Sequence, residues 1–157
     1  VNGSSVTVQE LDGETLAQLS RCKAQGADFL SGAPCGVVVL AEMAGLPVAE
    51  AACGNSVFGF HIHEGSKCEG NAEDPFAAVG QHYNPGDCPH PSHAGDLPPL
   101  FSNKGYAIQM FLTDRFTVEE IIGRTIVLHS GPDDFTSQPA GNAGKKIACG
   151  EIIPGVY

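Results

Sequence analysis

All six histidines of this chain fall between residues 61 and 129, and this restriction constrains the fold more than any other feature of the sequence. His61 and His63 lie in an alternating segment, residues 57–63, which predicts a strand with both imidazoles on one face and apolar side chains on the other. Their backbone positions are roughly 7 Å apart, which suits two ligands of one metal ion. We therefore expect a fold in which this strand meets other histidines.

Three of the four remaining histidines lie in a polar loop. His90, His93 and Asp96 are spaced i, i+3 and i+6 in a Pro-rich segment, which can wrap a small tetrahedral ion. His82 lies between the two groups, and His129 ends a predicted strand. Imidazoles suit copper and zinc, and a carboxylate beside several imidazoles suits zinc. A lone histidine is more often a surface or core residue, but the whole set predicts a metal site.

Five segments have the β-branched or alternating character of strands, and they lie at residues 36–40, 57–63, 106–112, 125–129 and 146–153. Two polar, Gly-rich loops at 64–105 and 130–145 separate them, and loops of such length are usually functional. A capping box at 117–120 predicts one short helical turn. A second capping box at 7–10 and a leucine stripe predict a helix over 8–25, with a strand over 5–11 as the alternative.

Length and composition limit the function classes. A chain of 157 residues with 42% hydrophobic residues predicts one domain over 1–157, with no linker or internal repeat. The net charge of −10 makes it a poor partner for nucleic acid or an anionic membrane, and no segment is apolar enough for membrane insertion. Gly-x-Ser-x-Gly, phosphate-loop and His-Glu-x-x-His patterns are absent from the sequence. Cys–His nucleophilic catalysis stays open, although the cysteines carry no local signature of it.

The six cysteines form no C-x-x-C pair, and their even number fits an oxidising compartment. We therefore expect an extracytoplasmic or secreted protein, although no signal peptide is visible. Six cysteines allow 15 connectivities, and the alternative that several are free buried thiols stays open.

Five stretches of the chain closely resemble the copper/zinc superoxide dismutase family. They are Gly-Phe-His-Ile-His-Glu at 59–64, Gly-Gln-His-Tyr-Asn-Pro at 80–85, His-Ala-Gly-Asp-Leu at 93–97, Ile-Gly-Arg-Thr-Ile-Val-Leu-His at 122–129 and Gly-Asn-Ala-Gly-Lys-Lys-Ile-Ala-Cys-Gly at 141–150. The similarity spans about residues 36 to 153. It implies an all-β fold, a Greek-key β-barrel or sandwich of the immunoglobulin-like type, whose two long loops cover the metals. It also implies dismutation of superoxide to dioxygen and hydrogen peroxide.

The resemblance also implies the site residues. The copper ligands would be His61, His63, His82 and His129, and the zinc ligands would be His82, His90, His93 and Asp96. His82 would bridge both metals and carry a proton during the redox cycle, while Asp133 would link His61 to His90. Cys68 and Cys149 would form the disulfide of the subunit.

Lys146 stands where the family usually has an arginine that attracts the anionic substrate. Lysine keeps the charge but loses the planar fork that holds an anion with two bonds. We therefore predict that activity persists but is lower than in a Lys146→Arg variant, measured at low salt.

The chain differs from the family pattern in three further ways, and other functions stay open. Residues 1–31 do not resemble the family's first two strands, and a helix there would expose a sheet edge that a homodimer could cover. The zinc segment from His90 to His93 and the loop at 130–145 are short. Four extra cysteines suggest disulfides between Cys35 and Cys88 and between Cys22 and Cys53. The main rival function is a non-enzymatic copper/zinc-binding module, and a zinc-stabilised adhesive domain is a third.

Overall fold

The computed structural model describes residues 5–10, 36–50 and 56–154. The elements in chain order are β1 (Ser5–Glu10), β2 (Val37–Ala44), β3 (Val57–Phe58), β4 (Phe60–His63), the 3₁₀ turn η1 (Ala77–Val79), β5 (Leu100–Phe101), β6 (Tyr106–Thr113), α2 (Val118–Ile121), β7 (Thr125–His129) and β8 (Lys146–Glu151). The helical content of these residues is a few short turns, so the prediction of an all-β fold is confirmed.

The N-terminal segment corrects one prediction. The helix expected to start at residue 8 is wrong there, because Ser5–Glu10 forms the strand β1, which was the alternative. Val6 and Val8 alternate with polar residues, and β1 pairs antiparallel with β2 over its full length, from Ser5 with Glu42 to Glu10 with Val37. Pairing with β2 gives the backbone N–H and C=O groups of this segment more hydrogen bonds than the two of a capping box could. The rest of the predicted helix lies outside the described residues.

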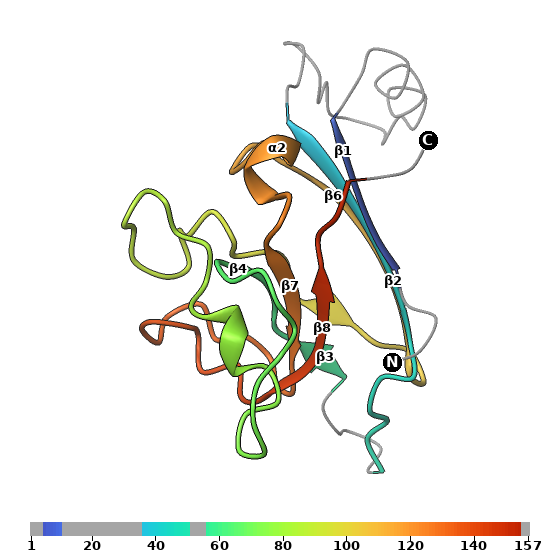
Figure 1. The fold of residues 1–157 in the computed structure, drawn as a ribbon. Helices are drawn as coiled ribbons and strands as arrows, with labels where there is room; N and C mark the ends of the chain where they lie inside the picture. The colour runs from blue at the N-terminus through green and yellow to red at the C-terminus, as the bar shows by residue number, and fades with distance from the viewer. Residues whose placement is uncertain (1–4, 11–35, 51–55, 155–157) are drawn as a thin grey trace, which may run out of the picture.

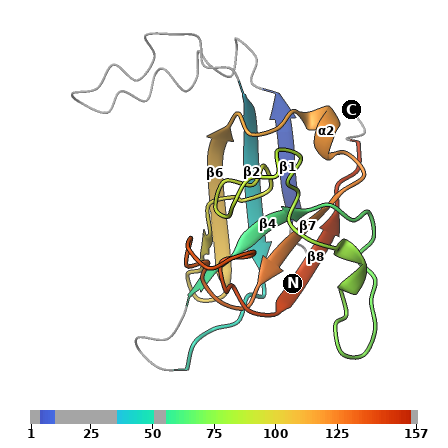
Figure 2. The same ribbon diagram turned by 90° about the vertical axis from the view of Figure 1, so that its left-hand side faces the viewer.

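Two three-stranded antiparallel sheets form the body of the molecule. One has the order β1-β2-β6 and the other β4-β7-β8, and β3 and β5 make a small third sheet. The two larger sheets lie in separate layers with their strands crossing (Figures 1 and 2). Within the described ranges, no strand pairing joins these sheets into a closed barrel.

The core lies between the two layers. Inward residues of β2, such as Val37, Val39 and Ala41, share one buried cluster with Phe60 and Ile62 of β4. Leu128 of β7, Leu100 of β5 and Ile121 of α2 complete this cluster from the other side and from the end. Burial of a side chain of this size contributes about 2 kcal/mol. The core thereby fixes β4 and β7, the strands that carry three of the histidines.

The elements follow the sequence prediction at α2 and differ from it at one strand. The strand expected over 57–63 is interrupted at Gly59, whose N–H donates to the carbonyl of Gly131 at 2.7 Å. A Cβ at this position would lie 2.7 Å from Cβ of Ala143, so only glycine lets the two segments approach. The capping box at Thr117 and Glu120 is present at the start of α2, as predicted.

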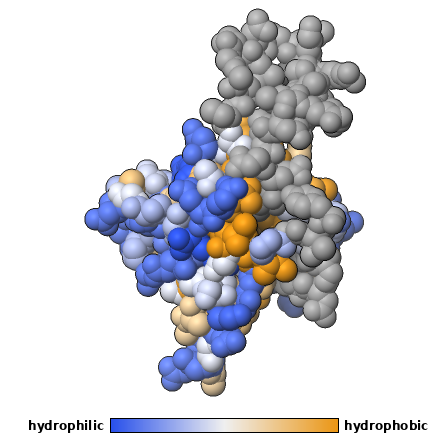
Figure 3. Space-filling view, turned by 45° about the horizontal axis from the view of Figure 1, so that its top comes forward, coloured by the Kyte–Doolittle hydropathy of each residue, from blue (hydrophilic) through white to orange (hydrophobic). Residues whose placement is uncertain are grey.

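Apolar side chains also reach the surface. They gather beside the grey atoms on the face shown in Figure 3. On the outer face of β6, Tyr106, Ile108, Met110 and Leu112 are exposed. None of the helices in the described part of the chain has the length and apolar character that a membrane span requires.

Candidate metal centre

Strand β4 brings the first two histidines under cover. All four of its residues are buried, because Phe60 and Ile62 face the core while the long loop lies over the other face. Bridges pair His61 with Asp96 and His63 with His82, so the loop runs directly along the strand. The predicted alternation is therefore present, with both faces enclosed.

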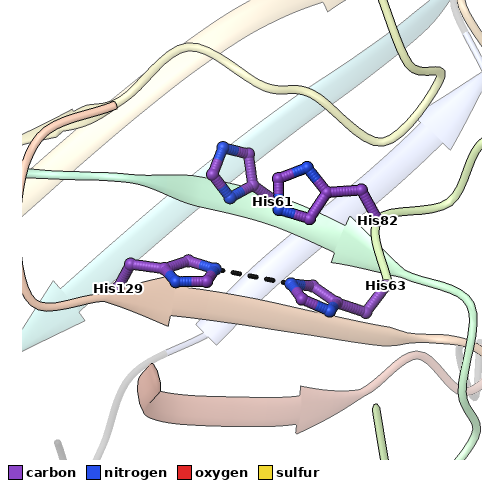
Figure 4. A group of neighbouring side chains, drawn as sticks. All are labelled: His61, His63, His82 and His129. Carbon is purple, nitrogen blue, oxygen red and sulfur yellow. Dashed lines mark hydrogen bonds between the residues drawn. The ribbon is translucent and has the colours of Figure 1, made fainter. Parts of the chain in front are cut away.

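The buried side chains form two groups that share one histidine. The four-histidine group consists of His61, His63, His82 and His129, and the mixed group consists of His82, His90, His93 and Asp96. Within each group the ligand atoms all lie within 4.8 Å of one another. Figure 4 shows the first group, with His61 and His63 from β4 facing His129 from β7 and His82 from the loop. The fold thus brings together all seven residues that the sequence suggested as ligands.

Backbone carbonyls fix the protonation of two rings in the four-histidine group. His63 Nδ1 donates to the carbonyl of Gly80 at 3.0 Å, and His129 Nδ1 donates to that of Gly144 at 3.2 Å. Since a carbonyl only accepts, each Nδ1 carries the hydrogen and each Nε2 presents a bare lone pair. The two Nε2 atoms nevertheless lie 3.4 Å apart (Figure 4). Neither has a hydrogen to share, so a cation between them is the arrangement that removes their repulsion.

Asp133 fixes two further rings, one in each group. Its carboxylate accepts from His61 Nε2 at 2.7 Å and from His90 Nε2 at 2.9 Å. It also accepts from the N–H of Phe135 at 2.7 Å, which holds the carboxylate in place. The other ring nitrogens, His61 Nδ1 and His90 Nδ1, therefore point into the two groups as lone pairs.

His82 faces both groups. Its Nδ1 lies 2.8 Å from Asp96 Oδ1 in the mixed group, while its Nε2 is buried without a hydrogen-bond partner in the four-histidine group. His93 Nδ1 is also buried without a hydrogen-bond partner, although it lies 3.3 Å from Asp96 Oδ2. To serve as a ligand in both groups, His82 must give up the proton at Nδ1. One imidazole ring can then join two metal ions.

Burial keeps three rings of the four-histidine group, those of His61, His63 and His129, neutral. It lowers the pKa of His61 from 6.5 to about 2 and that of His63 to about 3, and the charges of His82 and His129 act in the same direction. Burial also lowers the pKa of His129. In the mixed group burial raises the pKa of Asp96, but the hydrogen bond and charge of His82 outweigh it, so the net shift is downward. Neutral imidazoles and an ionised carboxylate are the forms that bind metals.

These observations test whether copper and zinc fit the site. Buried polar atoms normally have hydrogen-bond partners, and buried nitrogens without one are costly in an empty site. Here His61 Nδ1, His82 Nε2, His90 Nδ1 and His93 Nδ1 all lack one. One cation bound in each group would satisfy all four. Four imidazoles suit copper, and three imidazoles with a carboxylate suit zinc, so both groups fit.

Two supporting residues escaped the sequence interpretation. Gly141 has φ +65, and a Cβ there would lie 2.0 Å from Asp133 Oδ1 and 2.6 Å from His90 Nε2. Its place in the 141–150 motif was the available signal. Arg115 Nη1 donates to the carbonyls of Pro91, His93 and Asp96 at 3.0, 3.0 and 3.2 Å. It ties the loop of the mixed group to the turn after β6, and no local pattern marked it.

Lys146 starts β8 directly opposite His129. Its charge contributes to lowering the pKa of both His63 and His129, so it lies close to the four-histidine group. The ammonium is not free, because Nζ donates to Asp74 Oδ2 at 2.5 Å and to the carbonyl of Phe76 at 3.1 Å. The sequence did not single out Asp74. The hydrogen bond with Lys146 lowers the pKa of its carboxyl.

A disulfide joins Cys68 to Cys149 and so ties the long loop to β8. This is the pair that the family resemblance implied. Cys88 is an exposed free thiol, so the suggested disulfide between Cys35 and Cys88 is wrong. The Cys88 thiol instead contacts the carbonyl of Gly86 in its own turn. The suggested pairing of Cys22 with Cys53 lies outside the described residues.

The fold and the site together define an all-β metalloprotein with two adjoining metal sites. Comparison with known proteins narrows this class. The family model described as copper/zinc superoxide dismutase (SODC) matches residues 30–152. The chain belongs to the copper/zinc superoxide dismutase family.

Individual relatives agree with this placement. The chain is 36% identical to Cu-Zn superoxide dismutase 2 of Aquifex aeolicus over 132 residues, covering 74% of this chain and 72% of that protein. It is 32% identical to the Cu-Zn superoxide dismutase of Photobacterium leiognathi over 151 residues, covering 87% and 83%. The solved structure of the Cu/Zn superoxide dismutase from Brucella abortus matches with a TM-score of 0.65 and 31% identity, covering 78% and 84%.

Proposed function

We propose that this protein is a copper/zinc superoxide dismutase. In the overall reaction two superoxide anions and two protons give one dioxygen and one hydrogen peroxide. One observation carries the proposal: two buried ligand groups, one of four imidazoles and one of three imidazoles with a carboxylate, share His82. A shared imidazole is suited to coupling a redox metal to a structural one.

Each histidine ligand atom follows from the hydrogen bonds of its ring or from a buried nitrogen that lacks one. Copper would be held by His61 Nδ1, His63 Nε2, His82 Nε2 and His129 Nε2, and zinc by His82 Nδ1, His90 Nδ1, His93 Nδ1 and Asp96. When bound, copper supplies a one-electron redox couple and zinc a fixed, redox-inert charge. Asp133 orients His61 and His90 by accepting a hydrogen bond from each.

Two side chains have further roles. His82 Nε2 is the atom at which a proton is taken up and returned, while the mixed group holds Nδ1 in place. Lys146 attracts the superoxide anion, because its charge lies beside His63 and His129. This attraction matters in a chain whose net charge is −10.

The test is the dismutation rate per bound copper after reconstitution with copper and zinc. We expect a fast rate that is proportional to copper and falls as salt is added. A His63→Ala variant and protein loaded with zinc alone serve as controls and should lack this activity. Full copper loading with negligible turnover would contradict the proposal and identify the rival function, a non-enzymatic copper/zinc-binding module.

The compartment and the assembly belong to the same proposal. We place the protein outside the cytoplasm, because a disulfide between Cys68 and Cys149 persists in oxidising surroundings. Fractionation of the source cells checks this, and activity confined to the cytosol would contradict it.

We further propose a homodimer, supported by the exposed apolar side chains on the outer face of β6. Light scattering should give twice 16.3 kDa, and the mass of one chain would refute it.

A further inference from the structure

The carboxylate of Asp74 forms an ion pair with Lys146, the lysine whose charge acts on His63 and His129. Lys146 Nζ has two acceptors, Asp74 Oδ2 at 2.5 Å and the carbonyl of Phe76 at 3.1 Å. The Lys146 side chain is 18% exposed and that of Asp74 is 41% exposed, so the pair lies at the border between the interior and solvent. An anion that approaches Lys146 therefore meets a partly neutralised charge instead of an isolated ammonium.

The contact is built into the loop rather than formed by two mobile surface side chains. Asp74 Oδ1 accepts from the N–H of Phe76 at 3.0 Å, and Asn71 Oδ1 accepts from the N–H of Asp74 at 3.0 Å. The carbonyl of Asp74 accepts from the N–H groups of Asn71 and Ala77 at 2.9 and 3.2 Å. Both oxygens of the carboxylate are thus engaged, and its orientation toward Lys146 is fixed by the fold.

We propose that Asp74 is a positioning residue that anchors the Lys146 ammonium and reduces the positive charge with which the site meets anions. The inference rests on the proposed function and deepens it, because it names a residue that sets the site's affinity for its anionic substrate. The turn around Asp74 can be kept while its contact with Lys146 is removed. An asparagine at this position keeps an oxygen for the Phe76 N–H, but it has no negative charge and no second oxygen for Lys146.

The test uses azide as an anionic probe of the copper-loaded protein, followed by the absorption spectrum of the copper. We expect Asp74→Asn to bind azide about three- to tenfold more tightly at low ionic strength, because the Lys146 ammonium is then no longer neutralised by a carboxylate. The difference should shrink as salt is raised, since exposed charges are screened. The rate constant for superoxide should rise in parallel at low salt.

Two comparisons identify the route of the effect. Glu73→Gln changes the net charge by the same amount one residue away, but Glu73 is not an acceptor for Lys146. We expect it to alter azide affinity less than twofold, so an equal effect of both variants would overturn the proposal. In a Lys146→Ala background, Asp74→Asn should no longer tighten azide binding. If it still does, the carboxylate does not act through Lys146.

The outcome is separable from that of the proposed function. Azide affinity is measured without turnover, so a protein that binds copper but does not dismutate superoxide still reports on Asp74. An active enzyme whose Asp74→Asn variant binds azide no more tightly would refute the inference alone. Equal copper content and equal melting temperature of wild type and variant establish that the loop has not been lost.

Discussion

At the scale of single residues, the metal centre depends on small groups that leave room for the ligands. Gly141 lies against both Asp133 and His90, and its positive φ is a conformation that L side chains rarely adopt. The Asp133 carboxylate in turn sets which nitrogen of His61 and of His90 is free. The chemistry of two ligands therefore depends on a residue that has no side chain.

We expect Gly141→Ala to weaken zinc binding about 10- to 100-fold, because the added methyl group displaces the carboxylate that orients His90. Competition with a chromophoric chelator measures this affinity. Gly123→Ala is the matched control: its φ is +82, but a Cβ there meets nothing within 4 Å. The control should cost stability through backbone strain and leave zinc affinity unchanged. Equal zinc affinity in the two variants would show that the clash has no effect on the site.

At the scale of elements, the two sheets hold the strand histidines and the loops supply the rest. β4 and β7 pair over four residues, from Phe60 with Leu128 to His63 with Thr125, which fixes three of the four copper-side rings. The loop that carries the zinc-side residues has little secondary structure of its own. Arg115 compensates by donating to three of its carbonyls. These three hydrogen bonds from the guanidinium take the place of the backbone hydrogen bonds that a neighbouring strand would have provided.

Arg115→Ala should therefore lower zinc affinity about tenfold, with a smaller loss of copper affinity, because the carbonyl contacts hold the segment from Pro91 to Asp96. Metal titrations of the reconstituted protein measure both affinities. Lys67→Ala removes an equal charge from an exposed ion pair with Glu151 and should change neither. A zinc affinity in Arg115→Ala that matches wild type would rule out this role.

At the scale of the whole molecule, protonation of the buried histidines affects both metal binding and the free energy of unfolding. Burial lowers the pKa of His61 to about 2 and of His63 to about 3, and it lowers that of His129 as well. In the unfolded chain these rings titrate near 6.5. Below that pH the unfolded chain takes up protons that the folded chain excludes. The free energy of unfolding of the metal-free protein therefore falls as pH falls from about 6.5 toward 3.

The expected slope is about 1.4 kcal/mol per pH unit for each such histidine. Urea unfolding of chelator-treated protein should give a clearly lower midpoint at pH 5 than at pH 7. The metal-loaded protein should unfold at higher urea at both pH values, because its ligands bind only the folded state. A metal-free protein with the same midpoint at both pH values would contradict the burial of neutral histidines.

The sequence by itself determined the local features of this protein. The β-branched or alternating character of short segments predicted β2, β4, β6, β7 and β8, and the capping box at Thr117 predicted α2, because these signals depend on residues close together in the chain. The histidine distribution indicated a metal site, and the family motifs supplied its residues. The chemistry of imidazole and carboxylate suited copper and zinc, and the family resemblance named these two metals.

Only the tertiary structure decided features that join distant segments. The capping box at 7–10 predicted that a helix starts at residue 8, but residues 8–10 pair with β2 and form part of β1. The contacts of Asp74 with Lys146 and of Arg115 with the zinc-side loop connect residues 72 and 19 to 24 positions apart. The protonated nitrogen of each histidine depends on partners such as Gly80, Gly144 and Asp133. Local propensity contributes little free energy compared with the burial of side chains and the pairing of backbone groups between distant segments. The tertiary structure therefore decides features that residue spacing alone cannot determine.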